Sequence, residues 1–480
     1  MFSMGVLLMK PLRALFALAV CASGLSSIAH AQSAGKITVW LTAQDRSALL
    51  QKQPALPTYN NQKNSNPTIE VDSSKTFQTI DGFGFALTGG SAQLLQQMSQ
   101  PARTALLQRI FSSKQDGISV SYLRVSIGSS DMNAHPYSYD DLPAGQTDPE
   151  LKHFSLAEDL AAVIPTLKEI LAINPGIKIL GSPWSAPPWM KTNDSVKGGN
   201  LKPEYYQAYA QYFVRYIQAM KAAGITIDAV TVQNEPLNPK NTPSMVMFAQ
   251  EQDNFIKSAL GPAFQRAGIR TRILIYDHNA DVVSYALSIL GDPAASRYVA
   301  GSAWHLYGGE ASALTRVHDA FPNKQIYFTE QSITQKPDSA DIAIAGAISG
   351  VAVGATRNWA RNVLLWNLAA DPNAGPHTGD GGCPSCYGAI TLDGDKATFN
   401  VAYYTIAHFS RFVPPGSVRI ASTDMEQMEN VAFLTPDHHV VLVAANTGNF
   451  AKVFNVRYKG HSFTGTLQPG SAATYVWAAR

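Results

Sequence analysis

The chain has 480 residues, of which 45% are hydrophobic and only 15% are charged. This composition supplies a sizeable core and excludes a disordered chain. The formal net charge of +2 falls to zero if residues 1–31 are removed, because Lys10 and Arg13 leave without an acid, and this argues against nucleic acid or an anionic membrane surface as a main partner.

Residues 1–31 are predicted to be a secretory signal peptide. Lys10 and Arg13 precede or interrupt the short apolar run 12–20, and Ala29-His30-Ala31 forms a small-x-small cleavage site before Gln32. We therefore expect a secreted or periplasmic protein. The apolar run is too short for a membrane span, so no stable membrane insertion is expected, although an uncleaved N-terminal anchor is the alternative.

Two β-type runs follow, at 37–41 and 68–71, with a polar stretch between them. Neither run is followed by a helical pattern. We expect residues 32–75 to be N-terminal strands of a β-sandwich that is completed at the other end of the chain.

From residue 76 to 410, short apolar runs alternate with amphipathic helical patterns, which is typical of a parallel sheet. Eight such runs are enough to close a barrel, so we expect a (β/α)8 TIM barrel, an α/β fold. The expected strands are 79–86, 120–127, 177–183, 229–234, 273–276, 301–306, 326–329 and 363–367.

Two of the intervening helices have clear boundary signals. Ser155 and Glu158 have the spacing of a capping box, and leucine and isoleucine recur at helical spacing over 156–171, where Pro165 should kink or split the helix. A second helix is expected over 205–220, ended by Gly224.

The sequence pattern changes again near residue 411. Short β-type runs at 440–444, 453–456 and 473–476 are separated by Gly, Asn and Pro. Residues 411–480 are therefore expected to form a small antiparallel sandwich with residues 32–75, so that this domain is discontinuous.

Cys383 and Cys386 are the two cysteines outside the predicted signal peptide. In an exported protein, a single C-x-x-C pair is most simply a local disulfide, with free thiols or a metal or redox site as alternatives. No further ligands at zinc-like spacing are apparent, and Gly82-x-Gly84 lacks the third glycine of a dinucleotide fingerprint. Neither a metal nor an organic cofactor is predicted.

Two carboxylates occupy positions that favour catalysis. Glu235 follows the apolar run 229–232, and Glu330 follows the run 326–329. The carboxyl ends of barrel strands carry the active site, so both side chains should meet at the mouth. A pair of carboxylic acids is the minimum for cleavage of a glycosidic bond. The alternative is that both are ordinary strand-end acids paired with arginine or backbone amides.

Aromatic, amide and charged residues end several of the same predicted strands. Aromatic rings suit the C–H faces of sugars, while amides, carboxylates and guanidinium groups suit their hydroxyls. The residues in question are Arg124, Asp131, Trp184, Trp189, Asn234, Trp304, His305, Tyr307, Trp366 and Asn367. Any one of them alone could equally be a packing residue.

Together these segments resemble glycoside hydrolase family 30, which includes the lysosomal-type glucosylceramidases and bacterial relatives. The resemblance covers nearly the whole expected barrel and is most specific in the third and fourth segments. The matching segments are QTIDGFGFALTGG (78–90), YLRVSIGSSDM (122–132), SPWSAPPWMKTN (182–193), TVQNEP (231–236), WHLYGG (304–309), YFTEQS (327–332) and GGCPSCYGAITLD (381–393).

The resemblance implies a retaining double displacement with Glu330 as nucleophile and Glu235 as acid/base. It also implies that Asn234 holds the sugar 2-hydroxyl and that His305 and Tyr307 orient Glu330. Arg124, Asp131 and Trp184 would line the −1 sugar site, and Trp366 would close its wall. The loop 369–385 is longer and richer in Gly and Cys than in the lysosomal type, so the resemblance does not define the aglycone.

The expected function is thus a secreted retaining β-glycosidase of the β-glucosidase or glucosylceramidase type. Its substrate would be a β-linked glycoside or oligosaccharide, with a glycolipid included. An endo-β-1,6-glucanase or a β-xylosidase on the same scaffold is the alternative enzyme. A catalytically inactive carbohydrate-binding protein is the alternative from another class.

Overall fold

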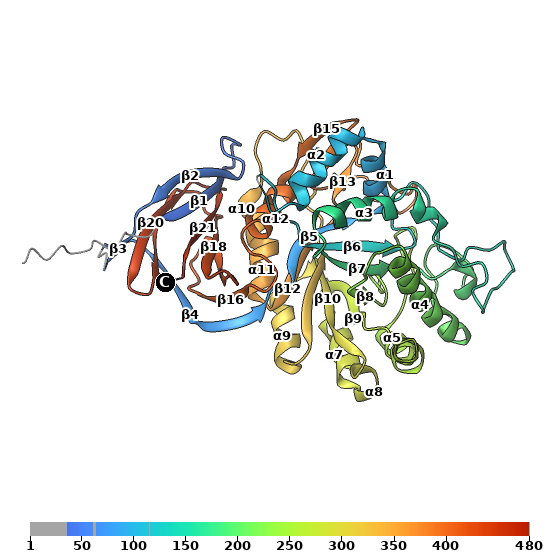
Figure 1. The fold of residues 1–480 in the computed structure, drawn as a ribbon. Coiled ribbons are helices and arrows are strands. Elements are labelled where there is room, and N and C mark those ends of the chain that lie inside the picture. The colour runs from blue at the N-terminus through green and yellow to red at the C-terminus, as the bar shows by residue number, and fades with distance from the viewer. Residues whose placement is uncertain (1–35, 61–63, 115, 480) are drawn as a thin grey trace, which may run out of the picture. The chain divides into compact units, whose positions relative to one another are not determined.

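The computed structural model describes residues 36–60, 64–114 and 116–479. Figure 1 traces their elements in chain order. The predicted signal peptide, residues 1–31, lies outside the described residues. None of the described helices is long and apolar enough to cross a membrane.

Eight parallel strands close into a barrel, as the sequence predicts. The predicted fourth strand is shorter than expected and ends at Thr231 instead of residue 234. The barrel strands are β5 (Gly82–Leu87), β6 (Tyr122–Ile127), β7 (Lys178–Pro183), β8 (Ala229–Thr231), β9 (Arg272–Ala280), β10 (Val299–Gly309), β11 (Gln325–Glu330) and β12 (Ala360–Leu365).

The barrel interior is filled by one side chain from each of seven strands, all fully buried in a single cluster. These residues are Tyr122, Leu180, Ala229, Leu274, Ala303, Tyr327 and Leu364. β5 contributes Gly84, where a Cβ atom would lie 1.8 Å from the backbone oxygen of Tyr122. The close approach of β5 and β6 therefore requires glycine, and the interior is a packed core as in other barrels of this kind.

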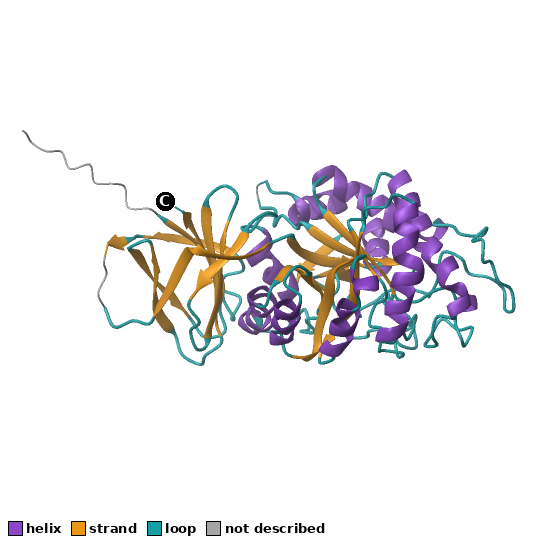
Figure 2. Cartoon of the chain, turned by 90° about the horizontal axis from the view of Figure 1, so that it is seen from below, coloured by secondary structure: helices purple, strands orange, loops and turns teal. Residues whose placement is uncertain are grey.

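Helices surround these strands, as Figure 2 shows in purple. The α-helices are α1 (Gly89–Gln97), α2 (Gln100–Phe111), α3 (Val163–Ile173), α4 (Tyr206–Ala222), α5 (Ala249–Phe255), α6 (Gly261–Arg266), α7 (Val283–Gly291), α8 (Pro293–Ser296), α9 (Ser312–Ala320), α10 (Ile344–Ala347), α11 (Gly354–Arg357) and α12 (Val401–Ser410). Short 3₁₀ turns lie at η1 (Ala157–Leu160), η2 (Pro188–Met190) and η3 (Pro203–Tyr205), and π-helical turns at η4 (Ile256–Leu260) and η5 (Ile348–Val353).

The predicted helix over 156–171 is split into η1 and α3, in agreement with the expected effect of Pro165. The predicted capping box is wrong, because the Ser155 hydroxyl accepts from the N–H of Ala157 and η1 has no side-chain cap. Helix α4 ends as predicted, with Gly224 at a φ of +86°.

A second, ten-stranded sheet contains strands from both ends of the described chain. Its strands are β1 (Ile37–Thr42), β2 (Gln51–Leu56), β3 (Tyr59–Asn60), β4 (Thr68–Thr79), β16 (Val418–Ser422), β17 (Met428–Leu434), β18 (His439–Asn446), β19 (Lys452–Tyr458), β20 (His461–Leu467) and β21 (Ala472–Ala478). A small sheet of β13 (Ala369–Ala370), β14 (Ile390–Asp393) and β15 (Lys396–Phe399) follows β12.

The sandwich is discontinuous, as predicted from the sequence. β1 pairs with β21, and β4 pairs with β16 on one side and β19 on the other. One expectation fails, since β4 and β19 are parallel and the sheet is not purely antiparallel. β4 also continues through the predicted boundary at residue 75 and ends at Thr79, so that only two residues separate it from Gly82, the first residue of β5.

Candidate active site

Glu235 and Glu330 meet at the carboxyl ends of the barrel strands. Glu330 is the last residue of β11, and Glu235 lies in the loop after β8 with a φ of +43°. Both residues are buried, with at most 7% of their surface exposed. One carboxylate oxygen of each and a ring nitrogen of His305 all lie within 4.8 Å of one another. This separation fits the roughly 5 Å of a retaining glycosidase and is too short for an inverting one.

Glu330 receives hydrogen bonds from two of the predicted site residues. The Arg124 guanidinium donates to Oε2, and the Tyr307 hydroxyl donates to Oε1 at 3.0 Å. Burial raises the pKa of Glu330, with a further contribution from the negative charge of Glu235, while Arg124 and His305 oppose this shift. The carboxylate is thus firmly oriented but desolvated.

Glu235 receives a different set of donors. His305 Nδ1 lies 3.2 Å from Oε1, and the Asn238 amide donates to Oε2 at 2.7 Å. Burial acts to raise the pKa of Glu235, but the contacts with His305, His278 and Asn238 outweigh it and lower the pKa to about 2. The empty site therefore favours an ionised Glu235.

His305 was expected to orient Glu330, but its shorter contact is with Glu235. Its ring nitrogen lies 3.9 Å from Glu330, against 3.2 Å from Glu235. Burial opposes the charged form, yet Glu330, Asp277 and Glu235 raise the pKa of His305 to about 9. The resulting imidazolium donates one N–H to Glu235 and the other to Asp277 at 3.1 Å.

Asp277, on β9, is a central residue that the sequence analysis did not select. Its carboxylate is fully buried and its pKa lies far below the usual range, because the charges and donors around it overcome the cost of burial. The donors are Arg124 (2.8 Å), Ser182 (2.7 Å), Thr231 (2.7 Å), His305 (3.1 Å) and Thr329 (2.6 Å). Asp277 follows the apolar run 273–276, so the strand-end rule that selected Glu235 and Glu330 would also have selected it.

The predicted sugar-binding residues lie at the same end of the barrel and contact one another. Arg124 is fully buried, donates to the Asn234 carboxamide at 2.7 Å and stacks 4.7 Å above the Trp184 ring. Trp184 in turn lies 5.4 Å from Trp366. Its indole N–H is buried and has no acceptor among the described residues, so it is a donor that a ligand can satisfy.

Asp131 lies in the loop after β6. It is 7% exposed, and burial together with the charges of Glu330 and Glu235 raises its pKa to about 8. A neutral carboxyl group can both donate to and accept from a sugar hydroxyl. The structure thus brings all nine predicted catalytic and binding residues to one end of the barrel.

Cys383 and Cys386 form a disulfide in the structure. Both cysteines belong to a small apolar cluster with Trp184, Trp366 and Met132. The loop after β12, in which the sequence departs from the lysosomal type, is therefore packed against the aromatic wall of the site.

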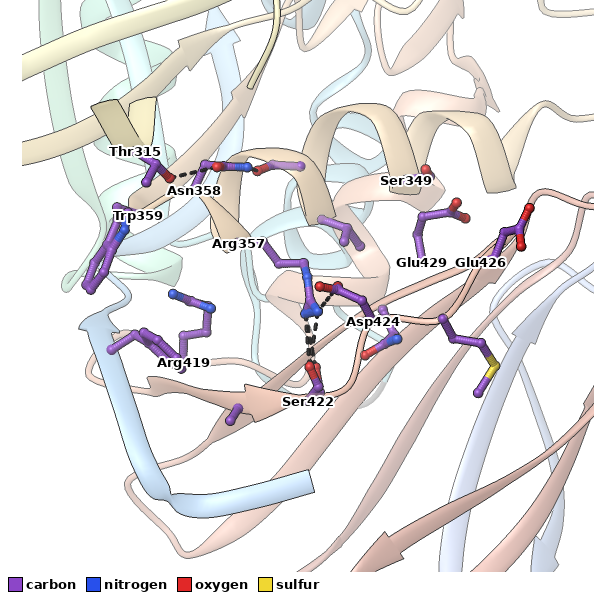
Figure 3. Close-up of a pocket in the computed structure, with 16 residues that line it drawn as sticks. Thr315, Ser349, Arg357, Asn358, Trp359, Arg419, Ser422, Asp424, Glu426 and Glu429 are labelled. Carbon is purple, nitrogen blue, oxygen red and sulfur yellow. Dashed lines mark hydrogen bonds and ion pairs between the residues drawn. The ribbon is translucent and has the colours of Figure 1, made fainter. Parts of the chain in front are cut away.

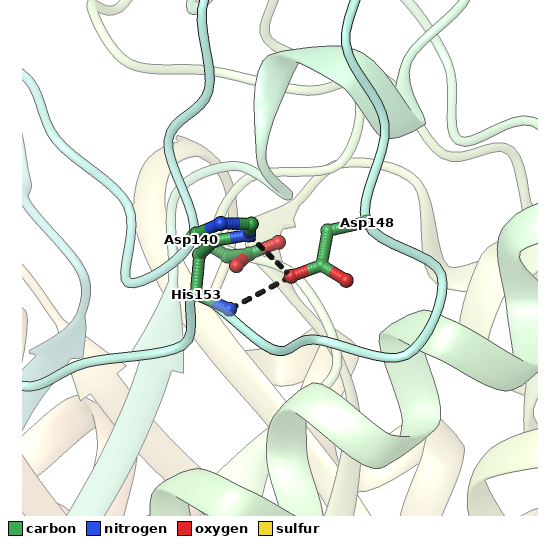
Figure 4. A group of neighbouring side chains, drawn as sticks. All are labelled: Asp140, Asp148 and His153. Atoms are coloured by element: carbon green, nitrogen blue, oxygen red, sulfur yellow. Dashed lines mark hydrogen bonds and ion pairs between the residues drawn. The ribbon is translucent and has the colours of Figure 1, made fainter.

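Two groups of three described side chains are close enough to hold a metal ion. In the first, Glu235, His305 and Glu330, both ring nitrogens of His305 already contact carboxylates, Nδ1 that of Glu235 and Nε2 that of Asp277. The second, Asp140, Asp148 and His153, is shown in Figure 4. Its Asp148 carboxylate already accepts from the backbone and ring of His153, at 2.8 and 2.9 Å.

A separate cavity of about 740 Å³ lies between α11, β16 and β17. Figure 3 shows Arg357 directed at Ser422 and Asp424 on one side and Arg419 beside Trp359 on the other. None of the predicted catalytic or sugar-binding residues lines it. The strand-end site is the better candidate for catalysis, because it contains both predicted carboxylates and the residues predicted to bind sugar.

Two domain families match the chain in sequence. Residues 80–413 match the glycosyl hydrolase family 30 TIM-barrel domain, and residues 416–475 match the glycosyl hydrolase family 30 beta sandwich domain. These two ranges correspond to the closed barrel and to the C-terminal strands of the ten-stranded sheet.

Individual relatives cover most of the chain. An endo-1,6-beta-D-glucanase from Neurospora crassa is 38% identical over 429 residues, which are 85% of this chain and 87% of the relative. The lysosomal acid glucosylceramidase of Mus musculus is 30% identical over 85% of this chain and 83% of its own length. The solved structure of an endo-beta1,6-glucanase superposes with a TM-score of 0.85 and 38% identity, over 92% of this chain and 99% of that chain.

Proposed function

The protein belongs to glycosyl hydrolase family 30 and is a glycoside hydrolase. We propose that it cleaves internal bonds of a β-1,6-linked glucan, with retention of configuration at the anomeric carbon. The observation that carries the proposed mechanism is the approach of the Glu235 and Glu330 oxygens to within 4.8 Å. That spacing leaves room for direct attack on a sugar carbon, but not for an intervening water molecule.

In the first step, a Glu330 oxygen attacks the anomeric carbon and the bond to the glycosidic oxygen breaks. Glu235 gives its proton to that oxygen, so the leaving sugar departs as an alcohol and a covalent glycosyl-enzyme remains. In the second step, Glu235 takes a proton from water, the water oxygen bonds to the anomeric carbon, and Glu330 is released as a carboxylate.

The contacts of the two carboxylates favour a proton distribution that is the reverse of the one needed for the first step. The contacts of Glu235 favour its ionised form, while burial raises the pKa of Glu330. Because the two carboxylates interact, they hold a single shared proton over a range of pH. A glycosidic oxygen beside Glu235 is an acceptor that only protonated Glu235 can satisfy, so substrate binding favours the productive arrangement.

The choice of β-1,6-glucan rests on the relatives. The sequence alone placed a β-glucosidase or glucosylceramidase first and an endo-β-1,6-glucanase second. The higher identity to the endo-1,6-glucanases, 38% against 30% for the mouse glucosylceramidase, supports the opposite order. Hydrolysis of a glycolipid is the second candidate, supported by that mouse relative.

We also propose that the enzyme is secreted or periplasmic, on the basis of the signal-like residues 1–31. Expression of the full chain in a bacterium, followed by mass spectrometry of the exported protein, tests this. A mature chain that begins at Gln32 supports the proposal, and an intact cytoplasmic chain contradicts it.

The substrate is tested with a panel of a linear β-1,6-glucan, glucosylceramide, and nitrophenyl β-glucoside and β-xyloside. We expect the glucan to be the best substrate and to yield a ladder of internal oligosaccharides at early times. Release of glucose alone would indicate exo action, and preference for the xyloside or the lipid would replace the proposed substrate. Absence of turnover on every member would favour the carbohydrate-binding alternative.

A further inference from the structure

Asn238 is the second side chain that donates to Glu235, and neither the sequence pattern nor the resemblance singled it out. The two oxygens of Glu235 have separate donors, with His305 on Oε1 and the Asn238 amide on Oε2 at 2.7 Å. Asn238 is half-buried in the loop after β8, three residues beyond Glu235.

The orientation of the Asn238 amide is fixed by its own loop. The side-chain oxygen of Asn238 (Oδ1) accepts from the backbone N–H of Lys240 at 3.0 Å. The side-chain NH₂ group must therefore point the other way, toward Glu235. The backbone N–H of Asn238 also donates to the Glu235 carbonyl at 2.8 Å. The two residues are thus held in one tight turn.

The same loop is tied to the chain that follows β12. The Thr378 hydroxyl donates to the carbonyl of Thr242 at 2.8 Å, and the backbone N–H of Thr242 donates to Gly381 at 3.3 Å. These bonds restrict the position of the turn that presents the amide. A neutral donor held in this way stabilises the ionised carboxylate and has nothing to offer the protonated oxygen.

We infer that Asn238 is a positioning residue that holds Glu235 in its ionised form, ready to take a proton from water in the second step. The inference rests on the proposed role of Glu235 as acid/base. In that role Glu235 must ionise again each time it has protonated a leaving group. Asn238 favours this return without gaining or losing charge itself.

Several other groups act on Glu235, and they differ from Asn238 because they titrate. They come from β9, β10, β11 and the loop after β6, and comprise Tyr276, His278, His305, Tyr307, Glu330 and Asp131. The effect of each group on the pKa of Glu235 changes when that group gains or loses a proton. The contribution of Asn238 is constant across the pH range and can be isolated by substitution.

The test is the pH dependence of kcat/KM for Asn238→Ala on a β-1,6-linked gluco-oligosaccharide. Loss of the donor raises the pKa of Glu235. The alkaline limb of the profile, where Glu235 loses its proton, should therefore move about one pH unit upward. Asn238→Asp, which places a second carboxylate at the same distance, should move that limb further in the same direction. Asn241→Ala is the matched control, because the Asn241 side-chain oxygen accepts from the Asn238 amide at 3.4 Å, whereas among the described residues no hydrogen bond joins Asn241 to Glu235.

Glu235→Gln separates failure of this inference from failure of the proposed function. If Glu235→Gln loses turnover of the oligosaccharide but keeps the first step on a dinitrophenyl glycoside, the acid/base role stands. An unchanged limb in both Asn238 variants then overturns the inference alone. If Glu235→Gln keeps full activity on the oligosaccharide, the proposed role of Glu235 is wrong, and the inference fails with it. An equal shift in Asn241→Ala would assign the effect to the loop instead of the Asn238 amide.

Discussion

Glu235 and Glu330 are identical side chains whose surroundings differ in kind. Glu330 is bound by the guanidinium of Arg124 and the phenol of Tyr307. Glu235 is bound by the imidazolium of His305 and by a neutral amide. Glu330 therefore contacts a permanent cation, whereas Glu235 contacts a group that can gain or lose a proton, and such a difference is consistent with the separate roles proposed for the two acids.

The separate roles predict different responses to the leaving group. Glu235→Gln should lower kcat/KM for a gluco-oligosaccharide by about 10²- to 10⁴-fold, because the leaving sugar then receives no proton. It should have much less effect on the first step with a dinitrophenyl glycoside, which needs no acid. Glu330→Gln should lose turnover of both. Burst kinetics with the two substrates measure this, and equal losses in the Glu235 variant would contradict the assignment.

Asp277 compensates the charges of Arg124 and His305 inside the barrel. Asp277→Asn keeps the shape of the side chain but leaves both buried cations with less negative charge. We expect a loss of about 3–5 kcal/mol in the free energy of unfolding, measured in urea. We also expect a fall in kcat, because Arg124 loses a contact that positions it against Glu330.

Asp81 provides the matched control for that substitution. It pairs with Lys178 at 2.8 Å and Arg361 at 3.0 Å, and it lies just before β5, at the opposite end of the barrel. Asp81→Asn should also destabilise the fold while leaving kcat unchanged. A similar loss of activity in both variants would show that the effect of Asp277→Asn is a general consequence of lower stability.

At the scale of elements, β8 decides where Glu235 lies. It is only three residues long, Ala229–Thr231, and the chain leaves strand geometry before Glu235. The backbone N–H of Glu235 then donates to Asp277 on β9, and that of Asn234 to Pro183 on β7, at 2.9 and 2.8 Å. The neighbouring strands therefore hold Glu235, the proposed acid/base, in its left-handed conformation at φ +43°.

Helix α12 meets the sandwich through a buried histidine. His408 contacts the hydroxyl of Thr474 on β21 and that of Thr42 on β1, each at 2.8 Å. Burial lowers its pKa to about 3, so the ring is neutral in the folded protein at neutral pH. Both sets of strands that build the sandwich are thereby joined to the last helix of the barrel.

This contact predicts a loss of stability in acid. Below about pH 6.5 the unfolded chain binds a proton at His408 that the folded chain does not, so stability should fall by about 1.4 kcal/mol per pH unit, or about 2 kcal/mol at pH 5. Urea unfolding at pH 7 and pH 5 measures the slope. His408→Gln should reduce it, whereas His461→Gln, an exposed position on β20, should not. An unchanged slope in His408→Gln would contradict the prediction.

Considered as a whole, the molecule has a hydrophobic cluster that joins the barrel to part of the sandwich, and a second cluster formed by sandwich residues alone. Val431 and Phe433 of β17 and Val441 of β18 belong to the same buried cluster as the barrel residues. The Phe83 ring of β5 lies 5.2 Å from Phe409 and 6.4 Å from Phe433. One side of the ten-stranded sheet therefore completes the barrel's own packing.

A shared cluster predicts that the two parts unfold together. Residues 76–410 expressed alone should aggregate or stay unfolded, because the apolar residues that β17 and β18 cover would be exposed. Calorimetry of the full chain should give a single transition. Two resolved transitions, or a monodisperse folded barrel fragment, would show that the shared cluster does not couple the unfolding of the two parts.

The order of the elements, and the residues that lie at the carboxyl end of the barrel, could be predicted from the sequence alone. Apolar runs of strand length mark all eight barrel strands, because such strands are buried on both faces. A polar residue directly after such a run must lie at the carboxyl edge of the sheet. This reasoning, with the family resemblance, was enough to place Glu235, Glu330, Arg124 and Trp184 at one site.

The contacts between these residues were found only in the three-dimensional structure. Asp277 as the shared acceptor, His305 on Glu235 instead of Glu330, Asn238 on the second oxygen of Glu235, and the parallel pairing of β4 with β19 were not found from the sequence. The physical reason is that each depends on distances between residues far apart in the chain, or on the direction of one amide in a turn. Strand periodicity fixes the face and the edge on which a side chain lies, whereas hydrogen-bond partners are fixed by how neighbouring strands and loops are aligned.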